Sequence, residues 1–395
     1  MTEYSRRLFL ASGAGLAAGS VAGTFLGANL AGASPADPLA VKKSHEFFGE
    51  HQNGIEVPNQ AHVAFIGLEL LPDTTKEACL RWMGIITEDA SRLAQGLPTL
   101  GDPQPELVIG PAGLTFTVGF GPGLFEKLGL ESKKPESLVN LPEFKMDRLR
   151  NEFSGGDVLI QIGSEDPIVL AHAVRQMVRT ASSFALTRYI QKGFLGAKDT
   201  SLPTPRSRNL MGQVEGSGNP VIGSEDFRQT VWVTDGPDWV RGGTLMVLRR
   251  IAMDLDGWDK LGRSAKEGVI GRTLDTSAPL GQSDEAAPLN LADKSVATSI
   301  PIDAHIRRAS SPISGTRIFR RSFNFVADLD QQSTQEVGLI WCAYQADISR
   351  QYLPIQRRLE QMDSLNTWTT PIGSAVFAIA RGVRPGEIIA HELLS

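Results

Sequence analysis

The hydrophobic pattern of the first half of the chain switches between a strand period of about two residues and a helical period of about 3.6. The apolar runs that predict strands span 62–70, 156–163 and, as two short strands around Gly113, 106–120. The apolar stripes that predict helices span 73–96, a short segment near 122–129 and the residues from Pro167 onward.

Two of these helices have recognisable starts. Thr74 followed by Glu77 forms a capping box, in which each side chain satisfies a free backbone N–H of the first helical turn. Asp166 followed by Pro167 puts a proline at the first helical position, where its missing N–H costs nothing. These starts support the helices that the apolar stripes predict.

The second half of the chain repeats the order of elements without repeating the sequence. Its predicted strands span 242–254, 317–327, 336–346 and 373–380, and its predicted helices span 255–272 and 349–365. Each half therefore follows the order β-α-β-β-α-β of a ferredoxin-like unit. Two such units with antiparallel sheets make an α+β protein. An irregular insertion of about residues 273–315 interrupts the second unit, and insertions of this kind are often functional.

The strand at 317–327 has two chemically different faces. Alternation places Phe319, Arg321, Phe323 and Phe325 on one face and Ile318, Arg320, Ser322 and Asn324 on the other. We expect the aromatic face to belong to the core. The face with Arg320, taken alone, is typical of a solvated strand surface.

The N-terminus resembles an export signal. Arg6 and Arg7 precede an uncharged run rich in Gly, Ala and Ser, and the sequence Ala-Gly-Ala then precedes Ser34. This composition, with its cleavage-like site, favours an export signal of the twin-arginine type over a membrane-spanning helix. We therefore expect export by the twin-arginine machinery to the periplasm or the exterior. That route carries folded proteins, often with a cofactor already inserted.

Chain length and charge limit the possible functions. Removal of residues 1–33 leaves enough chain for two domains of ordinary size, and we place a leader arm at 34–60 and the domains at 61–220 and 221–395. The formal net charge of −5 argues against nucleic acid as a partner. Cys79 and Cys342 are too few for a thiolate metal cage. They could pair, but each lies in an apolar segment, which favours two buried free thiols.

Three residues are candidates for chemistry, although each has an ordinary structural explanation. The six histidines show no spacing typical of a zinc site, and a lone residue such as His305 is usually structural. One imidazole is nevertheless enough to hold a haem iron. Glu215 lies in the glycine-rich stretch GQVEGSGNP, which is either a plain turn or a loop that brings its carboxylate close to a ligand. Arg320 lies on the polar strand face described above.

Seven blocks of the sequence together resemble the dye-decolourising (DyP-type) haem peroxidases, most closely the exported group with twin-arginine signals. In chain order the blocks are NLMGQVEGSGNP, GGTLMVLRRIAMDLDGWDKL, EGVIGRT, DAHIRRAS, RIFRRSFNF, GLIWCAYQADISRQYLPIQRRL and GSAVFAIARG. The resemblance runs from about residue 60 to residue 390. It implies two ferredoxin-like domains in a dimeric α/β barrel-like arrangement, with haem b held mainly by the second domain.

The resemblance also implies roles for individual residues. His305 matches the proximal ligand of the haem iron, and Arg320 matches the distal arginine. The G-x-x-D-G loop of the family matches Gly212 to Gly216, where Glu215 replaces the usual Asp. Glu keeps the carboxylate but adds one methylene, so its position relative to the iron must differ. The block RRASSPISG, in place of the more usual R-x-A-N-P-R, is a second departure.

Further contacts to haem follow from the same resemblance. Gly216 closes the distal loop, and Arg308, in preference to Arg307, is expected to bind a haem propionate. The second ring N–H of His305 needs an acceptor, for which Asp363 is a candidate from its position after the last helix. Buried Trp and Tyr residues are expected to serve packing, so none of them is assigned as an electron-transfer site.

The resemblance implies a peroxidase that reduces hydrogen peroxide and oxidises phenols or dyes, small aromatic reductants, by one-electron steps. Two other classes remain open from the sequence. One is a haem-binding protein for haem transfer or iron release with low peroxidase turnover. The other is a haem-free ferredoxin-like dimer with a binding function, and a homo-oligomer is compatible with all three.

Overall fold

The computed structural model describes residues 44–395 apart from 109, 203–205, 311–314 and 330–334. The predicted export signal at 1–33 and the first part of the leader arm lie outside the described residues. None of the helices in the described part combines the length and the apolar composition needed to cross a bilayer.

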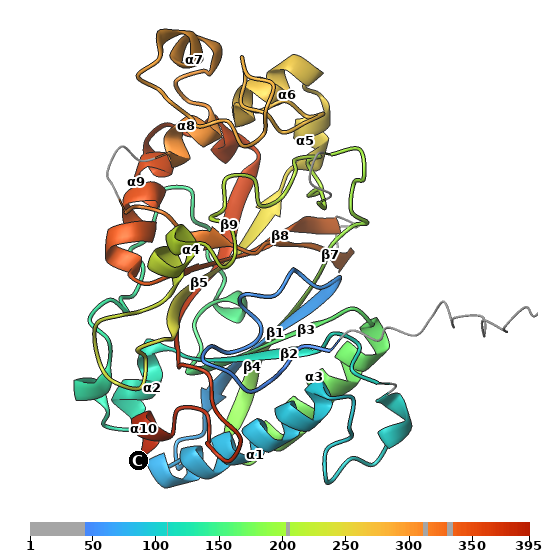
Figure 1. Ribbon diagram of the computed structural model, residues 1–395, viewed down its shortest axis with the longest axis vertical. Coiled ribbons are helices and arrows are strands. Elements are labelled where there is room, and N and C mark those ends of the chain that lie inside the picture. Colours follow the sequence, from blue (N-terminus) through green and yellow to red (C-terminus); the bar gives the residue numbers. More distant parts are fainter. Residues whose placement is uncertain (1–43, 109, 203–205, 311–314, 330–334) are drawn as a thin grey trace, which may run out of the picture. The chain divides into compact units, whose positions relative to one another are not determined.

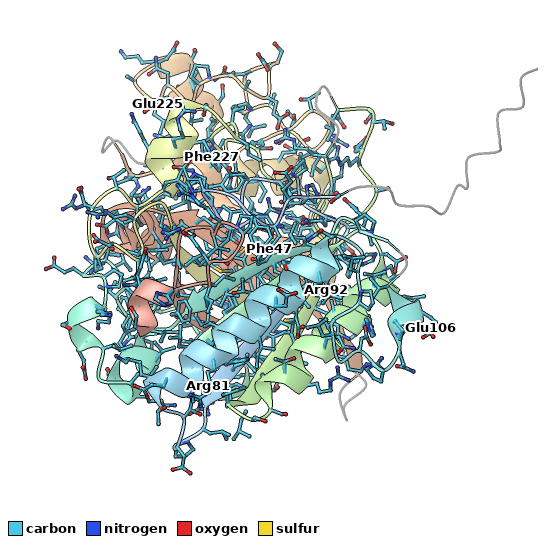
Figure 2. The ribbon with its side chains drawn as sticks, turned by 60° about the horizontal axis from the view of Figure 1, so that its bottom comes forward. Phe47, Arg81, Arg92, Glu106, Glu225 and Phe227 are labelled. Atoms are coloured by element: carbon cyan, nitrogen blue, oxygen red, sulfur yellow. The ribbon has the colours of Figure 1, made fainter. Side chains whose placement is uncertain are left out.

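The first half of the described chain forms a four-stranded antiparallel sheet with two helices on its outer face. The strands are β1 (His62–Leu70), β2 (Thr115–Phe120), β3 (Val158–Ser164) and β4 (Ala185–Phe194), and the helices are α1 (Lys76–Ala94) and α3 (Pro167–Ala181). The strand order β2-β3-β1-β4 is that of a ferredoxin-like unit. Figure 2 shows α1 and α3 side by side over this sheet.

The second half repeats this topology. Its strands are β5 (Thr244–Met253), β6 (Phe319–Arg320), β7 (Phe323–Leu329), β8 (Gln335–Gln345) and β9 (Thr369–Ile379), and α9 (Leu353–Met362) precedes the last strand. The order β9-β5-β8-β7 matches the first unit, because β5 pairs with both β8 and β9 while β7 pairs with β8. The prediction of two ferredoxin-like units in an α+β protein is confirmed.

Several predicted boundaries were wrong, each for a local reason. The segment 106–120 contains one strand, β2, preceded by a short 3₁₀ helix at Pro105–Leu107. The N-cap of α1 is Thr75, whose hydroxyl accepts from the Ala78 N–H at 3.2 Å, because the Thr74 hydroxyl instead donates to the Phe184 carbonyl at 2.6 Å.

The helical segments of the second half are also more divided than predicted. The segment 255–272 splits at Gly262 into α5 (Leu255–Asp259) and α6 (Arg263–Ile270). The last long helix begins with a π-helical turn at Ile348–Tyr352, followed by α9 with Pro354 in its first turn. The insertion 273–315 contains two short helices, α7 (Lys294–Ser299) and α8 (His305–Ala309).

The two sheets join edge to edge and close around an apolar interior (Figure 1). β2 pairs with β9 at one seam and β4 pairs with β7 at the other. The interior is packed mainly with aromatic side chains: Phe65, Tyr189, Phe323, Phe325, Tyr344 and Phe377. The predicted aromatic face of the strand at 317–327 is therefore confirmed as core.

The described part of the leader arm belongs to this packing. Gln52 lies at the seam between β2 and β9, where its Nε2 donates to the carbonyls of Val118 and Ala380 at 3.1 and 3.0 Å. Its Oε1 accepts from the Val118 N–H at 2.7 Å. Arg321, buried in the interior, donates to the carbonyls of Ile55 and Val57. The arm is thus tied to both halves by hydrogen bonds from buried side chains.

The two cysteines are free and buried in different clusters, as the apolar segments around them predict. Cys79 packs between α1 and the first sheet, and Cys342 lies in the barrel interior. Burial raises the pKa of each thiol to about 12. Both therefore stay protonated and unreactive at neutral pH.

Candidate active site

The glycine-rich stretch around Glu215 is a tight loop that closes on itself. Arg208 bridges to Val214, and the side-chain Oδ1 of Asn209 accepts from the N–H groups of Met211 and Gln213 at 3.0 Å each. Gly212 supports the reversal with a φ of 84°, a backbone conformation that side chains disfavour. The loop therefore has a defined geometry set by Asn209 and Gly212.

Glu215 is held at the end of this loop by polar neighbours. Its Oε1 accepts from Asn209 Nδ2 at 2.8 Å, and it also forms a hydrogen bond with Ser322. Burial raises the pKa of the Glu215 carboxyl above its ordinary value, while the Arg320 guanidinium, these two hydrogen bonds and the charge of His305 oppose that rise. The carboxylate is therefore a candidate for proton transfer.

Arg320 is positioned by the residues that follow Glu215. Asn219 Oδ1 accepts from both the backbone N and the Nε of Arg320, each at 3.2 Å, and the Ser217 carbonyl accepts from a terminal guanidinium nitrogen. Burial lowers the pKa of Arg320 and the Glu215 charge raises it. The structure thus brings the two predicted distal residues together, with opposite charges that stabilise one another.

The polar face of β6 and β7 is covered by this loop. Arg320 and Ser322 contact Glu215 or its neighbours, and Asn324 accepts from the Leu210 N–H at 3.1 Å and donates to the Arg208 carbonyl at 3.2 Å. Ser322 and Asn324 are buried, so this face is not the solvated surface that its composition suggests in isolation. The alternation pattern placed these residues on one face, but the sequence carries no signal for the loop that covers it.

His305, the first residue of α8, faces the site from another element. Its Nδ1 lies 2.7 Å from Oδ2 of Asp363, a buried carboxylate that also caps the 3₁₀ turn Ser364–Thr367. A carboxylate at this distance assigns the proton to Nδ1 and leaves Nε2 as the free lone pair. Asp363, named only as a candidate from sequence, thus lies where an acceptor for the His305 N–H is needed.

An apolar cluster connects the segments that carry Glu215 and His305. The charge of His305 acts on Glu215, so the two groups lie within electrostatic reach. An apolar cluster contains Met211 of the distal loop, Leu339 of β8 and Trp258 of α5, with Ile306 of α8 and Trp341 of β8 packed against it. Ile306 and Trp341 are only half-buried. The cluster therefore packs the distal loop, β8, α5 and α8 together through apolar side chains.

A group of arginines that the sequence analysis did not assign lies beside the distal loop. Burial and the charges of Arg320 and Arg206 lower the pKa of Arg272 to about 10. Burial and Arg320 also lower the pKa of Arg206, which forms an ion pair with Glu285. Three half-buried guanidiniums near one another favour an anionic ligand. Arg272 belongs to the block EGVIGRT, so its position in that block was the available signal.

The other residues predicted to contact haem, Gly216 and Arg308, and the alternative Arg307, make contacts within the protein. Gly216 adopts a φ of 82° beside Arg206 and Asn219, so its backbone shapes the end of the loop. Arg308 donates to the Arg358 carbonyl of α9 at 3.2–3.3 Å, and Arg358 donates back to the Arg308 carbonyl at 3.0 Å. These reciprocal bonds hold α8 against α9. Arg307 donates to the carbonyls of Ala297 and Ile300 at the end of α7.

Comparisons with known proteins identify relatives of the whole described chain. The family models "Dyp-type peroxidase, N-terminal" and "Dyp-type peroxidase, C-terminal" match residues 52–195 and 206–384. A dye-decolorizing peroxidase of Thermobifida fusca is 35% identical over 99% of this chain and 97% of its own. A deferrochelatase of Yersinia pestis is 30% identical over 88% of this chain and 84% of its own. The crystal structure of a DyP-type peroxidase from Cellulomonas bogoriensis is 39% identical, with a TM-score of 0.84 over 90% of this chain and 99% of that one.

Proposed function

The chain belongs to the DyP-type peroxidase family, and from that premise we propose that Glu215 and Arg320 act on hydrogen peroxide and that His305 would bind the iron of a haem b group. DyP-type peroxidases are haem enzymes, and this protein is a haem-dependent peroxidase of that family.

The residues present fit a haem group. His305 offers Nε2 as a ligand, because its Nδ1 is engaged by Asp363. The apolar cluster that contains Met211 and Leu339 suits the flat, apolar macrocycle. Haem propionates are anions, and Arg206 and Arg272 are half-buried guanidiniums near the distal loop. We therefore propose these two arginines as propionate partners, since the guanidinium of Arg308 donates to α9.

The observation that carries the proposal is that Glu215, in the closed loop, and Arg320, in β6, interact electrostatically while the residues after Glu215 hold the Arg320 side chain. When bound, haem iron supplies the coordination site and the redox equivalents. Glu215 accepts a proton from one oxygen of hydrogen peroxide and delivers it to the other oxygen, which leaves as water. Arg320 stabilises the negative charge that develops on the leaving oxygen.

The extra methylene of Glu215 is accommodated by the loop itself. Asn209 holds Oε1 at 2.8 Å, and the loop turns back at Gly212 and Gly216, both with positive φ. Misplacement of a catalytic group by ~1 Å can slow a reaction about 100-fold, so this fixed position matters for the rate. We propose that Glu215 serves here in place of Asp.

We further propose that each turnover uses two one-electron oxidations of a small aromatic reductant. Hydrogen peroxide takes up two electrons and two protons and becomes two molecules of water.

We also propose that residues 1–33 direct export by the twin-arginine route, which rests on Arg6, Arg7 and the uncharged run that follows them. Cell fractionation of the wild type and an R6K/R7K variant tests this: export that persists in the variant argues against the route.

Stopped-flow mixing of the holoenzyme with hydrogen peroxide tests the distal roles, with the Soret band as the readout. E215Q keeps the shape of the side chain but cannot hold the proton, and R320L removes the charge. Each is expected to slow the peroxide reaction by about 100-fold or more. E225Q, at an exposed position of α4 (Glu225–Val231), is the matched control. Peroxide reaction at the wild-type rate in both E215Q and R320L refutes the assignment.

Iron release is a second candidate function, because one group of relatives carries the name deferrochelatase. Those relatives share 30% identity with this chain, and the name describes them. Incubation of the holoprotein with an iron chelator, followed by the fluorescence of metal-free porphyrin, measures this activity directly. Porphyrin that appears faster than from free haem supports the second function, and its absence leaves peroxidase turnover as the activity of the site.

A further inference from the structure

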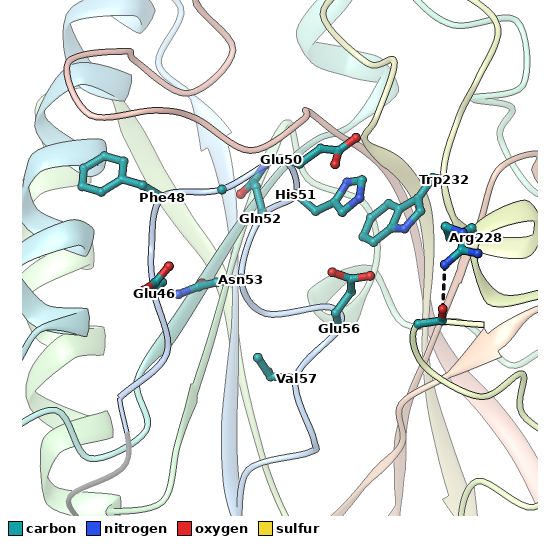
Figure 3. Close-up of a pocket in the computed structure, with 12 residues that line it drawn as sticks. Glu46, Phe48, Glu50, His51, Gln52, Asn53, Glu56, Val57, Arg228 and Trp232 are labelled. Carbon is teal, nitrogen blue, oxygen red and sulfur yellow. Dashed lines mark hydrogen bonds between the residues drawn. The ribbon is translucent and has the colours of Figure 1, made fainter. Parts of the chain in front are cut away.

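A pocket of about 410 Å³ lies between the leader arm and α4, outside the residues assigned so far (Figure 3). Its size lies within the range of pockets that bind small molecules. Residues from Glu46 to Val57 of the arm form one wall, and Gly223, Arg228 and Trp232 form the other. The arm positions its wall through Gln52, which is bound to β2 and β9.

The centre of the pocket is a stacked pair of aromatic rings. The imidazole of His51 and the indole of Trp232 lie parallel within 5°, with ring centroids 3.6 Å apart. His51 is fixed in this orientation because its Nδ1 lies 2.6 Å from the Gly242 carbonyl. Trp232 is only 6% exposed, yet its indole N–H has no hydrogen-bond partner among the described residues. This stack is a platform for another flat ring.

The charge of the pocket is negative. Three of the described lining residues, Glu46, Glu50 and Glu56, are acidic, and in Figure 3 the side chains of Glu50 and Glu56 are drawn on either side of the ring stack. Arg228 is a cation on the opposite wall, and it is already paired with Glu225 at 2.9 Å. A flat ligand with a positive charge therefore complements the pocket, whereas a sulfonated dye does not.

An aromatic path leads from this pocket to the distal strand. The ring centroids of Trp232 and Phe227 are 6.0 Å apart, and those of Phe227 and Phe319 are 4.9 Å apart. Phe319 directly precedes Arg320 in β6. The three rings are buried, so the path from the pocket to Arg320 runs through packed protein. An electron can therefore cross the barrel wall through rings in close contact.

We propose that this pocket binds planar aromatic cations as reducing substrates and that Trp232 passes their electrons to the haem site. The inference rests on the proposed function, because the haem must lie beside Arg320. Trp232 would relay one electron at a time from the bound dye, and haem, when bound, would accept it. The indole keeps its proton, since no acceptor for the N–H lies nearby among the described residues. Two dye molecules thus lose one electron each while hydrogen peroxide and two protons from solvent become two waters.

Binding is tested first on the holoenzyme without peroxide. Calorimetric titration with methylene blue, a flat phenothiazinium cation, is compared with titration by a sulfonated anthraquinone dye. The wild type is expected to bind methylene blue more tightly than the sulfonated dye. Added salt is expected to weaken the binding of methylene blue. The E50Q/E56Q double variant is expected to bind methylene blue about threefold to tenfold more weakly, because an exposed charge contributes up to about fivefold.

Electron transfer is tested with W232F, which keeps a flat ring but is much harder to oxidise. We expect its kcat for methylene blue to fall about tenfold or more with KM little changed. A tryptophan radical, seen by electron paramagnetic resonance after peroxide addition, is expected in the wild type and not in W232F. W82F is the matched control, because Trp82 is also buried, also lacks a partner for its indole N–H, and lies on α1 away from the pocket.

The outcomes separate the parts of the proposal. The assignment of the pocket as a binding site is wrong if methylene blue does not bind, or if its affinity does not change in E50Q/E56Q and with salt. This test does not depend on whether W232F folds. Oxidation by W232F at the wild-type rate overturns the electron path. Failure of the proposed function has a different signature, because E215Q and R320L then react with peroxide normally while dye binding without peroxide is unaffected.

Discussion

Asn219 holds Arg320 at three points. Its Oδ1 accepts from the backbone N and the Nε of Arg320 at 3.2 Å each, and its Nδ2 donates to the Arg320 carbonyl at 2.8 Å. The same loop carries Glu215, so one short segment positions both the carboxylate and the guanidinium. The separation of the two charges is thereby set by local hydrogen bonds.

The first prediction follows from this contact. N219A removes all three hydrogen bonds and lets the Arg320 side chain move, so we expect the peroxide reaction to slow about 10- to 100-fold. N219D keeps the acceptor for Arg320 Nε and should recover part of the rate. Stopped-flow kinetics with hydrogen peroxide measure both variants. N140A, at an exposed position, is the control, and a loss of rate in N219A no larger than in N140A contradicts the positioning role.

The second prediction concerns pH. Burial raises the pKa of Glu215 and the Arg320 charge lowers it, so removal of that charge in R320L must raise the pKa further. Because the carboxylate accepts a proton only when ionised, the acid limb of the peroxide rate profile should move to higher pH in R320L.

Rate profiles between pH 3 and pH 9 measure this shift, with R350L as a control, since the Arg350 side chain is 87% exposed. E215D should move the limb the other way, because the ordinary pKa of Asp lies about 0.4 unit below that of Glu. An acid limb at the same pH in wild type and R320L excludes Glu215 as the group that titrates.

The third prediction concerns the pair His305 and Asp363, whose Nδ1 and Oδ2 are 2.7 Å apart. D363N removes the negative charge that makes the imidazole a stronger ligand. We expect haem affinity to fall by about tenfold and the reduction potential of the bound iron to rise. Haem titration and spectroelectrochemistry measure the two quantities. D347N is a matched control, because Asp347 also caps a helical turn but has no histidine partner among the described residues. Equal effects of the two variants contradict a role of Asp363 in tuning His305 and leave it only its role as a helix cap.

The fourth prediction concerns stability. Gln52 makes three buried hydrogen bonds across the seam between β2 and β9. Q52L leaves those backbone groups without their partner, so the free energy of unfolding should fall by about 1–3 kcal/mol. Urea denaturation of the holoprotein measures the change. Q229A, on the exposed side of α4, should change stability by less than about 0.5 kcal/mol. A similar loss of unfolding free energy in Q52L and Q229A contradicts a stabilising role of the Gln52 hydrogen bonds at the seam.

The order of strands and helices was predictable because each element has its own hydrophobic period. The boundaries were less so. By sequence, either Thr74 or Thr75 could cap the helix. Thr75 is the cap in the structure, because the Thr74 hydroxyl donates to the Phe184 carbonyl, which is distant in the chain. Gly262 divides a helical stripe that composition alone leaves continuous.

For the site, alternation along one strand was enough to set Arg320, Ser322 and Asn324 on a common face, because strand geometry is local. Family resemblance supplied Glu215 and His305 as candidates. Neither kind of argument revealed Asn219 or Arg206 as neighbours of Arg320, or the ring stack of His51 on Trp232. Those contacts join residues far apart in the chain, and their distances follow from how the two sheets close and where the arm is bound, which short-range patterns do not encode.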